Sequence, residues 1–531
     1  MSDCLPYQDI PYFNKLIVDY LNKKEDTANF YHRFPEIEAF DDQMKEKRLT
    51  FPTENRKILV KELHYQYEKF PLSEETGKHI RSLSDIDTFT ITTGHQLNIF
   101  TGPIYFIYKI VTCIKLCHQL KLRYPDKQFV PVYWMATEDH DLEEIQFFNW
   151  KTEKKVWKTN QTGAVGRMKT EAFEDLFANF DNELGIGDKA NDLRKLFQKA
   201  YLFHNNLADA TRYLVNELFK DYGLVIIDGD SKALKQVFVP QMKNELLHQQ
   251  SYKKVTNTIK ALQSFDYPVQ VNPREINLFY LTDSKRSRIV KKESTYKVLD
   301  STIKFSESEL LGELQNNPER FSPNVMLRPL YQEMVLPNLA YVGGAGELTY
   351  WFQLKSYFES EEVAFPMLIL RNAALMKTKK QTKKIAKLNL SWKDIFQGKL
   401  YVENKIVKQK SSIAIDFSPQ KELLSNQFRE LYELAKQTDA SFLGAVAAQE
   451  KKQKNGLENL EKRLLKAQKK KLSEAIQLAN NLREEIFPKG TLQERYINFG
   501  EAYLAMQKPF IPSLLERFEP LNFVFDLIDL D

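Results

Sequence analysis

Short runs of consecutive apolar residues recur along the first part of the chain, and stretches with helical spacing separate them. The runs cover residues 89–93, 130–135, 223–227, 324–327 and 365–370. Continuous apolar runs are typical of parallel strands that are buried on both faces, with helices forming the crossover connections. The pattern therefore predicts an α/β fold with a doubly wound parallel sheet.

The spacing between these runs indicates two insertions in the core. About 80 residues separate the second run from the third, which is more than one crossover connection needs. A similar excess, with β character near residues 269–290, precedes the fourth run. The predicted parts are an N-terminal helical part of the core at 1–85, the first half of the core at 86–150, an inserted connecting subdomain at 151–220, core again at 221–245, a second insertion at 246–320, the second half of the core at 321–376, a helical coiled-coil domain at 377–510 and a C-terminal tail at 511–531.

The chain becomes lysine-rich and helical after residue 371. Leu424, Phe428, Leu431 and Ala435 follow the 4-3-4 spacing of a coiled-coil seam, and a second apolar stripe runs from Val446 to Ile486. Two such helices in succession predict an antiparallel hairpin. Its exposed seam would be buried against a second copy of the protein.

The composition is that of a globular protein with room for about three domains. The chain has 531 residues, of which 43% are hydrophobic and 28% charged. Its net charge of +5 is too small over this length to indicate nucleic-acid binding. The three cysteines form no disulfide framework, and no apolar stretch approaches the roughly 18 residues of a membrane span. We therefore expect a soluble cytoplasmic protein that binds neither nucleic acid nor membrane.

Four ionisable residues follow the second apolar run: Glu138, Asp139, His140 and Asp141. Such groups at the end of a buried strand acquire perturbed pKa values, which suit them to general-base catalysis or to Mg²⁺ binding. These four are the predicted catalytic residues. The alternative is an N-terminal cap of the next helix, in which an aspartate accepts backbone hydrogen bonds.

Glycine-rich loops and two arginines near the same edge of the sheet are predicted to bind substrate or nucleotide. Backbone N–H groups of a strand-to-helix loop can receive an anion, and an arginine can clamp a carboxylate. The alternatives are structural turns and ion pairs with neighbouring acids. The predicted binding residues are Thr93, Gly94, His95, Gln96, Thr101, Gly102, Tyr105, Lys109, Arg328, Gly343, Gly344, Gly346, Glu347 and Arg371.

One helix carries Cys113, Cys117 and His118 on a mostly apolar background. We interpret the two thiols as buried core groups rather than metal ligands. No structural metal is therefore expected.

Five motifs occur in order along the chain: TGHQ at 93–96, FTGPIYFIYK at 100–109, PVYWMATEDHD at 131–141, SPNVMLRP at 322–329 and AYVGGAGE at 340–347. Together they resemble the BshC family, the cysteine ligases of bacillithiol biosynthesis, and the resemblance covers nearly the whole chain. It implies a Rossmann-like core with connecting-peptide insertions and a C-terminal α-helical coiled-coil hairpin used for homodimerisation. It also implies the reaction: L-cysteine is added to glucosaminyl malate through an amide bond, the last step in making the low-molecular-weight thiol bacillithiol.

Our hypothesis from the sequence is an amide-forming (acid–amino) ligase. Joining a carboxylate to an amine is uphill in water, so we expect ATP with Mg²⁺ as the activating cosubstrate and a cysteinyl adenylate or phosphate as intermediate. The acidic cluster would deprotonate the sugar ammonium or hold Mg²⁺, and Arg328 and Arg371 would bind carboxylates. These roles require the loop at 94–102 and residues 138–141 to meet at one pocket.

Two other functions fit the same residues. One is a nucleotidylyltransferase-like enzyme acting on another small carboxylic acid, because edge loops of this kind suit adenylation generally. The other is a non-catalytic coiled-coil scaffold whose α/β core senses a nucleotide.

Overall fold

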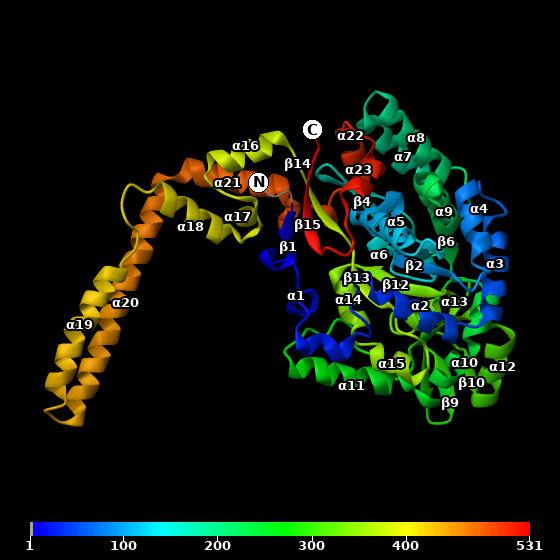
Figure 1. The fold of residues 1–531 in the computed structure, drawn as a ribbon, viewed down its shortest axis with the longest axis horizontal. Coiled ribbons are helices and arrows are strands. Elements are labelled where there is room, and N and C mark those ends of the chain that lie inside the picture. Colours follow the sequence, from blue (N-terminus) through cyan, green and yellow to red (C-terminus); the bar gives the residue numbers. More distant parts are fainter. Residues whose placement is uncertain (1–3, 531) are drawn as a thin grey trace. The chain divides into compact units, whose positions relative to one another are not determined.

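The structure is a computed structural model that describes residues 4–530, and these residues form two units (Figure 1). The first unit comprises residues 4–8, 12–376 and 493–530, and the second comprises 9–11 and 377–492. The helical domain that we predicted at 377–510 therefore ends earlier, at Leu492. Residues 493–510 belong to the first unit, where Glu494 pairs with Arg371 and Gln493 bonds the backbone of Met376.

The core of the first unit is a five-stranded sheet in the order β13-β12-β2-β3-β6, and every neighbouring pair is parallel. The strands are β2 (Thr88–His95), β3 (Gln128–Met135), β6 (Val225–Asp228), β12 (Asn338–Gly343) and β13 (Met367–Leu370). The chain winds from β2 outward to β3 and β6, then returns to the other side of β2 with β12 and β13. The doubly wound sheet is thus confirmed, and its switch point lies between β2 and β12.

Hydrophobic side chains from two helices pack with this sheet. The helix α5 (Tyr105–Arg123) contributes Cys113 and Cys117, and α2 (Ala39–Thr50) contributes Phe40 and Met44, to one cluster with strand residues such as Ile91. Both thiols lie inside this core, as the helical spacing predicted.

Residues 324–327, predicted as a strand, form a turn instead. The Asn324 side chain accepts hydrogen bonds from the backbone N–H groups of Met326 and Leu327, which closes an Asx turn. The helix α13 (Arg328–Val335) then begins, with Pro329 in its first turn. The fourth parallel strand is β12, which lies outside the five predicted runs.

Both predicted insertions carry their own secondary structure. The region near 151–220 holds the hairpin β4 (Phe147–Trp150) and β5 (Glu153–Val156), then α7 (Phe173–Leu184), α8 (Asp188–Tyr201) and α9 (Leu207–Phe219). The region near 246–320 holds α11 (Gln250–Ser264), α12 (Glu307–Asn316) and most of an antiparallel sheet in the order β10-β9-β8-β7-β11, formed by β7 (Leu278–Leu281), β8 (Arg286–Lys292), β9 (Thr295–Val298), β10 (Lys304–Ser306) and β11 (Phe321–Pro323).

The remaining elements of the first unit surround this core. Its helices include α1 (Lys15–Leu21), α3 (Thr53–Tyr67), α4 (Glu74–Ser82), α6 (Leu142–Ile145), α10 (Lys232–His248), α14 (Ala345–Trp351), α15 (Lys355–Ser360), α22 (Phe499–Ala505) and α23 (Phe510–Arg517). Within the predicted C-terminal tail, β15 (Val524–Asp529) lies between β1 (Cys4–Pro6) and β14 (Ala373–Lys377) in a small sheet, so its backbone is paired on both sides.

The second unit is helical and contains the predicted hairpin. Its helices are α16 (Lys379–Lys387), α17 (Trp392–Phe396), α18 (Lys399–Lys410), α19 (Ser418–Ala435), α20 (Ala440–Lys471) and α21 (Ser473–Ile486). Phe428, Ala435 and Val446 are buried where α19 and α20 pack together. Leu431, which the spacing also assigned to the seam, is 41% exposed. The second stripe is not one helix, because Leu472 leaves the helical conformation between α20 and α21.

From residue 4 to residue 530, every helix is too short or too polar to cross a lipid bilayer.

Candidate active site

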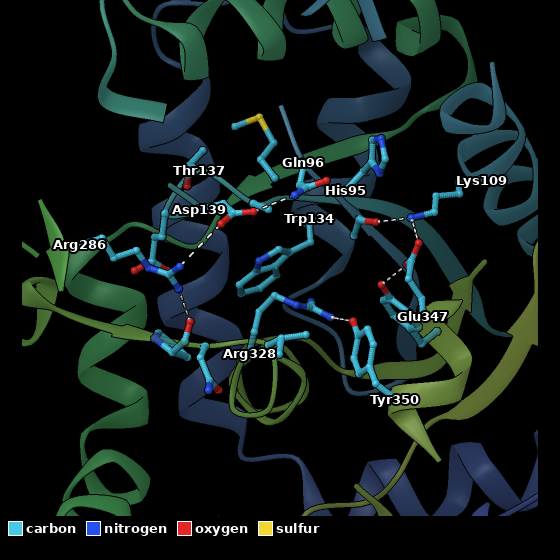
Figure 2. A pocket seen from close by; sticks show the side chains of 18 of the residues that line it. His95, Gln96, Lys109, Trp134, Thr137, Asp139, Arg286, Arg328, Glu347 and Tyr350 are labelled. Carbon is cyan, nitrogen blue, oxygen red and sulfur yellow. Dashed lines mark hydrogen bonds and ion pairs between the residues drawn. The ribbon is translucent and has the colours of Figure 1, made fainter. Parts of the chain in front are cut away.

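A cavity of about 320 Å³ lies at the carboxyl ends of β2 and β3, beside the switch point of the sheet (Figure 2). This is where ligands bind in doubly wound folds, and the volume is within the range of small-molecule sites. Its lining comprises Gly94, His95, Gln96, Tyr105, Lys109, Trp134, Met135, Ala136, Thr137, Glu138, Asp139, Arg286, Pro323, Asn324, Val325, Arg328, Tyr341, Glu347 and Tyr350.

Half of the residues predicted from sequence line this cavity. They are Gly94, His95, Gln96, Tyr105, Lys109, Glu138, Asp139, Arg328 and Glu347. The two segments that had to meet do so, because the Gln96 side-chain amide donates a hydrogen bond to Asp139 Oδ2 at 2.9 Å. The loop after β2 and the loop after β3 therefore share one pocket.

Thr137, Glu138 and Asp139 form one side of the cavity, which we call the acidic wall. Burial would raise the pKa of Asp139, but hydrogen bonds from His140 and Gln96 and the charge of Arg286 outweigh it and hold the pKa well below its usual range. Burial and the neighbouring Asp230 raise the pKa of Glu138, against the opposing charge of Lys235. The pKa values of the two carboxyl groups are thus shifted in opposite directions. Asp139 stays a carboxylate, and Glu138 is the better proton acceptor.

The first insertion fixes the backbone of the acidic wall. The Val165 N–H donates to Asp139 O at 2.7 Å, and the Gly166 N–H donates to Thr137 O at 2.8 Å. A Cβ atom on Gly166 would lie 2.6 Å from Thr137 Cβ, so only glycine allows this approach.

The second insertion adds Arg286, which sequence reasoning missed. Its guanidinium donates to Ser322 Oγ at 3.0 Å and to Pro323 O at 2.8 Å, and it lies 4.2 Å from the Phe279 ring centroid. One nitrogen remains 3.7 Å from Asp139 Oδ1. Arg286 is one of several basic residues along β8, and no local sequence signal distinguishes it from the others.

Lys109 and Arg328 form the opposite side of the cavity with Glu347 and Tyr350, and we call this side the basic wall (Figure 2). Tyr341 belongs to it as well, because its hydroxyl donates to Glu347 Oε2 at 2.9 Å. Lys109 is buried, donates to Gly94 O at 2.8 Å and forms an ion pair with Glu347. Burial lowers the pKa of Lys109, and Glu347 opposes this change. The Lys109 ammonium is thus held beside the end of β2, where an anionic group of a ligand could reach it.

The Arg328 guanidinium is fixed by uncharged partners. It donates to Tyr350 Oη at 3.1 Å and to Gln332 Oε1 at 2.9 Å. It also packs against Gly94, where a Cβ atom would lie 3.4 Å from the nearest guanidinium nitrogen. Because no carboxylate among residues 4–530 takes both of its edges, Arg328 keeps charge available for a ligand anion.

His95 also lines the cavity, and only 8% of it is exposed. Burial and the charges of Lys109 and Arg371 lower its pKa well below the usual value, so the imidazole is neutral. Its Nε2 has no hydrogen-bond partner within residues 4–530. A neutral imidazole of this kind can hydrogen-bond a ligand but cannot act as a cationic acid.

Two of the four predicted catalytic residues serve other purposes. Asp141 caps α6, because its carboxylate accepts the Glu144 N–H at 3.4 Å, which is the alternative we gave for this segment. His140 stands outside the cavity lining, and its Nδ1 lies 3.2 Å from an Arg286 nitrogen.

Arg371 is not in the cavity. Its guanidinium pairs with Glu494 at 2.7 and 3.1 Å in the buried interior. The ion pair that we gave as the alternative role is therefore what the structure has.

Several predicted loop residues are structural. Thr93 Oγ1 donates to Val342 O at 2.8 Å between strands. Thr101 and Gly102 have positive φ in a turn held by Asn498, whose amide donates to Phe100 O and Gly102 O, each at 2.8 Å. The remaining predicted residues absent from the cavity lining are Gly343, Gly344 and Gly346, which lie at the turn from β12 into α14.

Across the described residues, 4–530, no group of three or more His, Cys, Asp or Glu side chains is arranged to hold a metal ion.

Comparison with known proteins agrees with the sequence motifs. The family description "Bacillithiol biosynthesis BshC, N-terminal Rossmann-like domain" matches residues 1–372, and the corresponding "C-terminal coiled-coil domain" matches 374–530. Proteins named "Putative cysteine ligase BshC" are 51% identical in Flavobacterium johnsoniae, over 100% of both chains, and 49% identical in Christiangramia forsetii, over 99% of both. The relative of that name in Lysinibacillus sphaericus is 27% identical over 96% of both chains. The chain therefore belongs to the BshC family.

Proposed function

We propose that this protein is a ligase that adds L-cysteine to glucosaminyl malate and so completes bacillithiol. Family membership over the full length supports the reaction class. The observation that carries the proposal is the pairing of a basic and an acidic wall across one cavity at the switch point of the sheet. A substrate with carboxylates at one end and an amine at the other matches that arrangement.

The basic wall suits the malate end of the substrate. Lys109 and Arg328 present two cations from a largely buried surface, where electrostatic attraction is stronger than in water. Glu347 neutralises part of this charge through Lys109, so the wall favours an anion without carrying an excess of unpaired charge.

The acidic wall suits the amine. A glucosamine ammonium must lose a proton before its nitrogen can attack a carbonyl carbon. Glu138 is the better base of the two carboxylates, because the pKa of Asp139 is held low by hydrogen bonds and charge. Asp139 would instead keep the ammonium in place by charge attraction.

ATP with Mg²⁺ is the cosubstrate that we propose for activation of the cysteine carboxylate. The residues of the chain then bind both substrates, orient the amine and accept its proton at Glu138. Exclusion of water by the cavity walls would protect the activated carboxyl group from hydrolysis.

The test is a reconstituted reaction. Purified protein incubated with L-cysteine, glucosaminyl malate and ATP-Mg²⁺ should yield the conjugate, detected by mass spectrometry, together with AMP or ADP. Omission of each component in turn is the control. If no conjugate forms with any nucleoside triphosphate, the proposed function is wrong.

We also propose that the hairpin of α19 and α20 joins two copies of the chain. Its apolar residues Leu423, Leu434, Phe442 and Leu460 are exposed by 64%, 55%, 42% and 54% in the single chain. Apolar exposure of this extent along a hairpin is typical of a helical interface. Light scattering should give twice the 62.3 kDa chain mass for the wild type, and Leu423→Lys with Leu434→Lys should give the chain mass itself. A wild type that is already monomeric would contradict the proposal.

A further inference from the structure

Lys235 is a fully buried cation directly behind the acidic wall. It lies in the first turn of α10, and its side chain has no exposed surface. Its ammonium group is 2.6 Å from Glu138 Oε1 and 3.1 Å from Asp230 Oδ1, and it donates to Glu319 O at 3.0 Å. The contact with Glu138 is an ion pair, and those with Asp230 and Glu319 are hydrogen bonds.

Glu138 depends on Lys235 for its place in the cavity wall. Among residues 4–530, Lys235 is the one cation within 4 Å of the Glu138 carboxylate. The Glu138 side chain keeps 14% of its surface exposed and lines the cavity, so one side of it faces Lys235 and another faces the ligand space.

Asp230, the second carboxylate beside Lys235, has a further cationic partner. Arg167, from the first insertion, binds both oxygens of Asp230 at 2.8 and 3.0 Å. The charges alternate from Arg167 through Asp230 and Lys235 to Glu138, which ends at the cavity. A buried carboxylate without a partner is costly. Lys235 lies between Asp230 and Glu138, so its charge allows these two carboxylates to remain close together.

We infer that Lys235 is a positioning residue, whose ammonium group holds the Glu138 carboxylate at the cavity wall so that its outer oxygen faces the substrate amine. The inference rests on the proposed function. Lys235 touches no ligand itself, since it does not line the cavity. It acts on the reaction through Glu138.

The test is a double-mutant cycle on turnover in the full-length protein. Lys235→Met should lower kcat about 10²-fold, the cost of a misplaced catalytic group, with a much smaller change in KM. Lys235→Arg should restore most of kcat. If Lys235 acts through Glu138, Lys235→Met should cause no further loss in a Glu138→Gln background.

Lys232→Met is the matched control. Lys232 lies in the same turn of α10, but its side chain is 57% exposed and pairs with Glu319 away from the cavity. Its kcat should equal that of the wild type. Normal kcat in Lys235→Met, or an equal additional loss in the Glu138→Gln background, would overturn the inference.

Two further measurements distinguish loss of folding in Lys235→Met from an incorrect assignment of Lys235. If Lys235→Met does not fold, as judged by circular dichroism and thermal unfolding, Lys235→Met with Asp230→Asn keeps the net charge of the buried group unchanged while Glu138 still lacks its cation, and its kcat should remain low. Wild-type kcat in this double variant would overturn the inference.

If the wild type makes no conjugate, the proposed function fails, and crystal structures of the variants decide the inference. In Lys235→Met the Glu138 carboxylate should leave its place at the cavity wall, because its neighbouring cation is gone, whereas in Lys232→Met it should stay. An unmoved Glu138 in Lys235→Met would count against Lys235.

Discussion

The two walls of the cavity are built in different ways. The basic wall comes from the core fold: Lys109 lies on α5, Arg328 on α13 and Glu347 on α14. The acidic wall follows the core strand β3, but both insertions hold it, through Val165 and Gly166 on one side and Arg286 on the other. The core thus supplies binding charge, and the insertions adjust the groups that we assign to proton transfer. Changes in the basic wall should mainly raise KM, and changes in the acidic wall should mainly lower kcat.

Glu138→Gln should have the largest effect. The amide keeps the shape of the side chain but cannot accept the proton of the amine, so we expect kcat to fall by about 10²–10⁴-fold with KM nearly unchanged. Asp139→Asn should cost less, because Asp139 binds rather than deprotonates. Steady-state kinetics on both variants checks the order, and a larger loss of kcat in Asp139→Asn would reverse our assignment.

Arg328→Lys should raise KM for glucosaminyl malate by about 10-fold and change kcat little. A lysine cannot contact Tyr350 and Gln332 and still present a planar pair of donors to a carboxylate. Varying cysteine at saturating glucosaminyl malate is the control. A KM effect confined to cysteine would place the cysteine carboxylate at the basic wall instead.

Much of this arrangement could be predicted from the sequence. The apolar runs at β2, β3, β6 and β13 indicated the parallel sheet, and polar residues directly after β2 and β3 indicated where the cavity would lie. The strand predicted at 324–327 was wrong although the local sequence carries turn signals, because Asn324 can close an Asx turn and Pro329 suits the first turn of a helix.

Two charged residues that were missed reach the cavity or its wall from distant segments. Arg286 comes from an antiparallel hairpin, and Lys235 is one of two lysines in the same helical turn, of which only the structure shows one to be buried. Arg371 is the converse case, a predicted site residue that is structural. It follows a strand, as a carboxylate-binding arginine would, but it pairs with Glu494, more than 120 residues further along the chain. Long-range pairing of charges is what sequence spacing does not encode.

Gly166→Ala should disturb the acidic wall with an intermediate effect. Its Cβ would lie 2.6 Å from Thr137 Cβ and 3.0 Å from Thr137 O, so the loop must move, at a cost of about 1–3 kcal/mol of unfolding free energy and a reduced kcat. Gly312→Ala is the control, because no atom lies within 4 Å of the added methyl group in α12, where alanine favours the helix. Equal stability of the two variants would show that the contact of the insertion with Thr137 is dispensable.

Gly94→Ala should affect the basic wall more mildly. The added Cβ would lie 3.3 Å from Tyr341 Oη and 3.4 Å from an Arg328 nitrogen, both at the ends of side chains that can shift by a few tenths of an ångström. We expect KM for glucosaminyl malate to rise by a few fold, with kcat and the unfolding midpoint nearly unchanged. A loss of kcat larger than that of Gly166→Ala would contradict the division of roles between the walls.

The smallest effect concerns stability and pH. Asp228, at the end of β6, accepts a hydrogen bond from Thr137 of the acidic wall. Burial, with the nearby Asp230, raises its pKa to about 6, although Thr137, the Asp230 backbone and Arg212 oppose the change. Above pH 4 the carboxyl group ionises readily in the unfolded chain but keeps its proton in the folded protein until about pH 6. Its contribution to stability is therefore full below about pH 4 and is lost as the pH rises through 6.

Asp228→Asn does not titrate, and its side-chain oxygen can still accept the Thr137 hydrogen bond. Its free energy of unfolding relative to the wild type should therefore increase from pH 4 to pH 7.5, by on the order of 1–3 kcal/mol. Urea unfolding of both proteins at the two pH values measures the difference, and titrations that they share cancel. A difference that is constant with pH would mean that Asp228 is already ionised behind the acidic wall at pH 4. The cations Arg212, Arg167 and Lys235 would then neutralise more carboxylates there than Lys109 does in the basic wall.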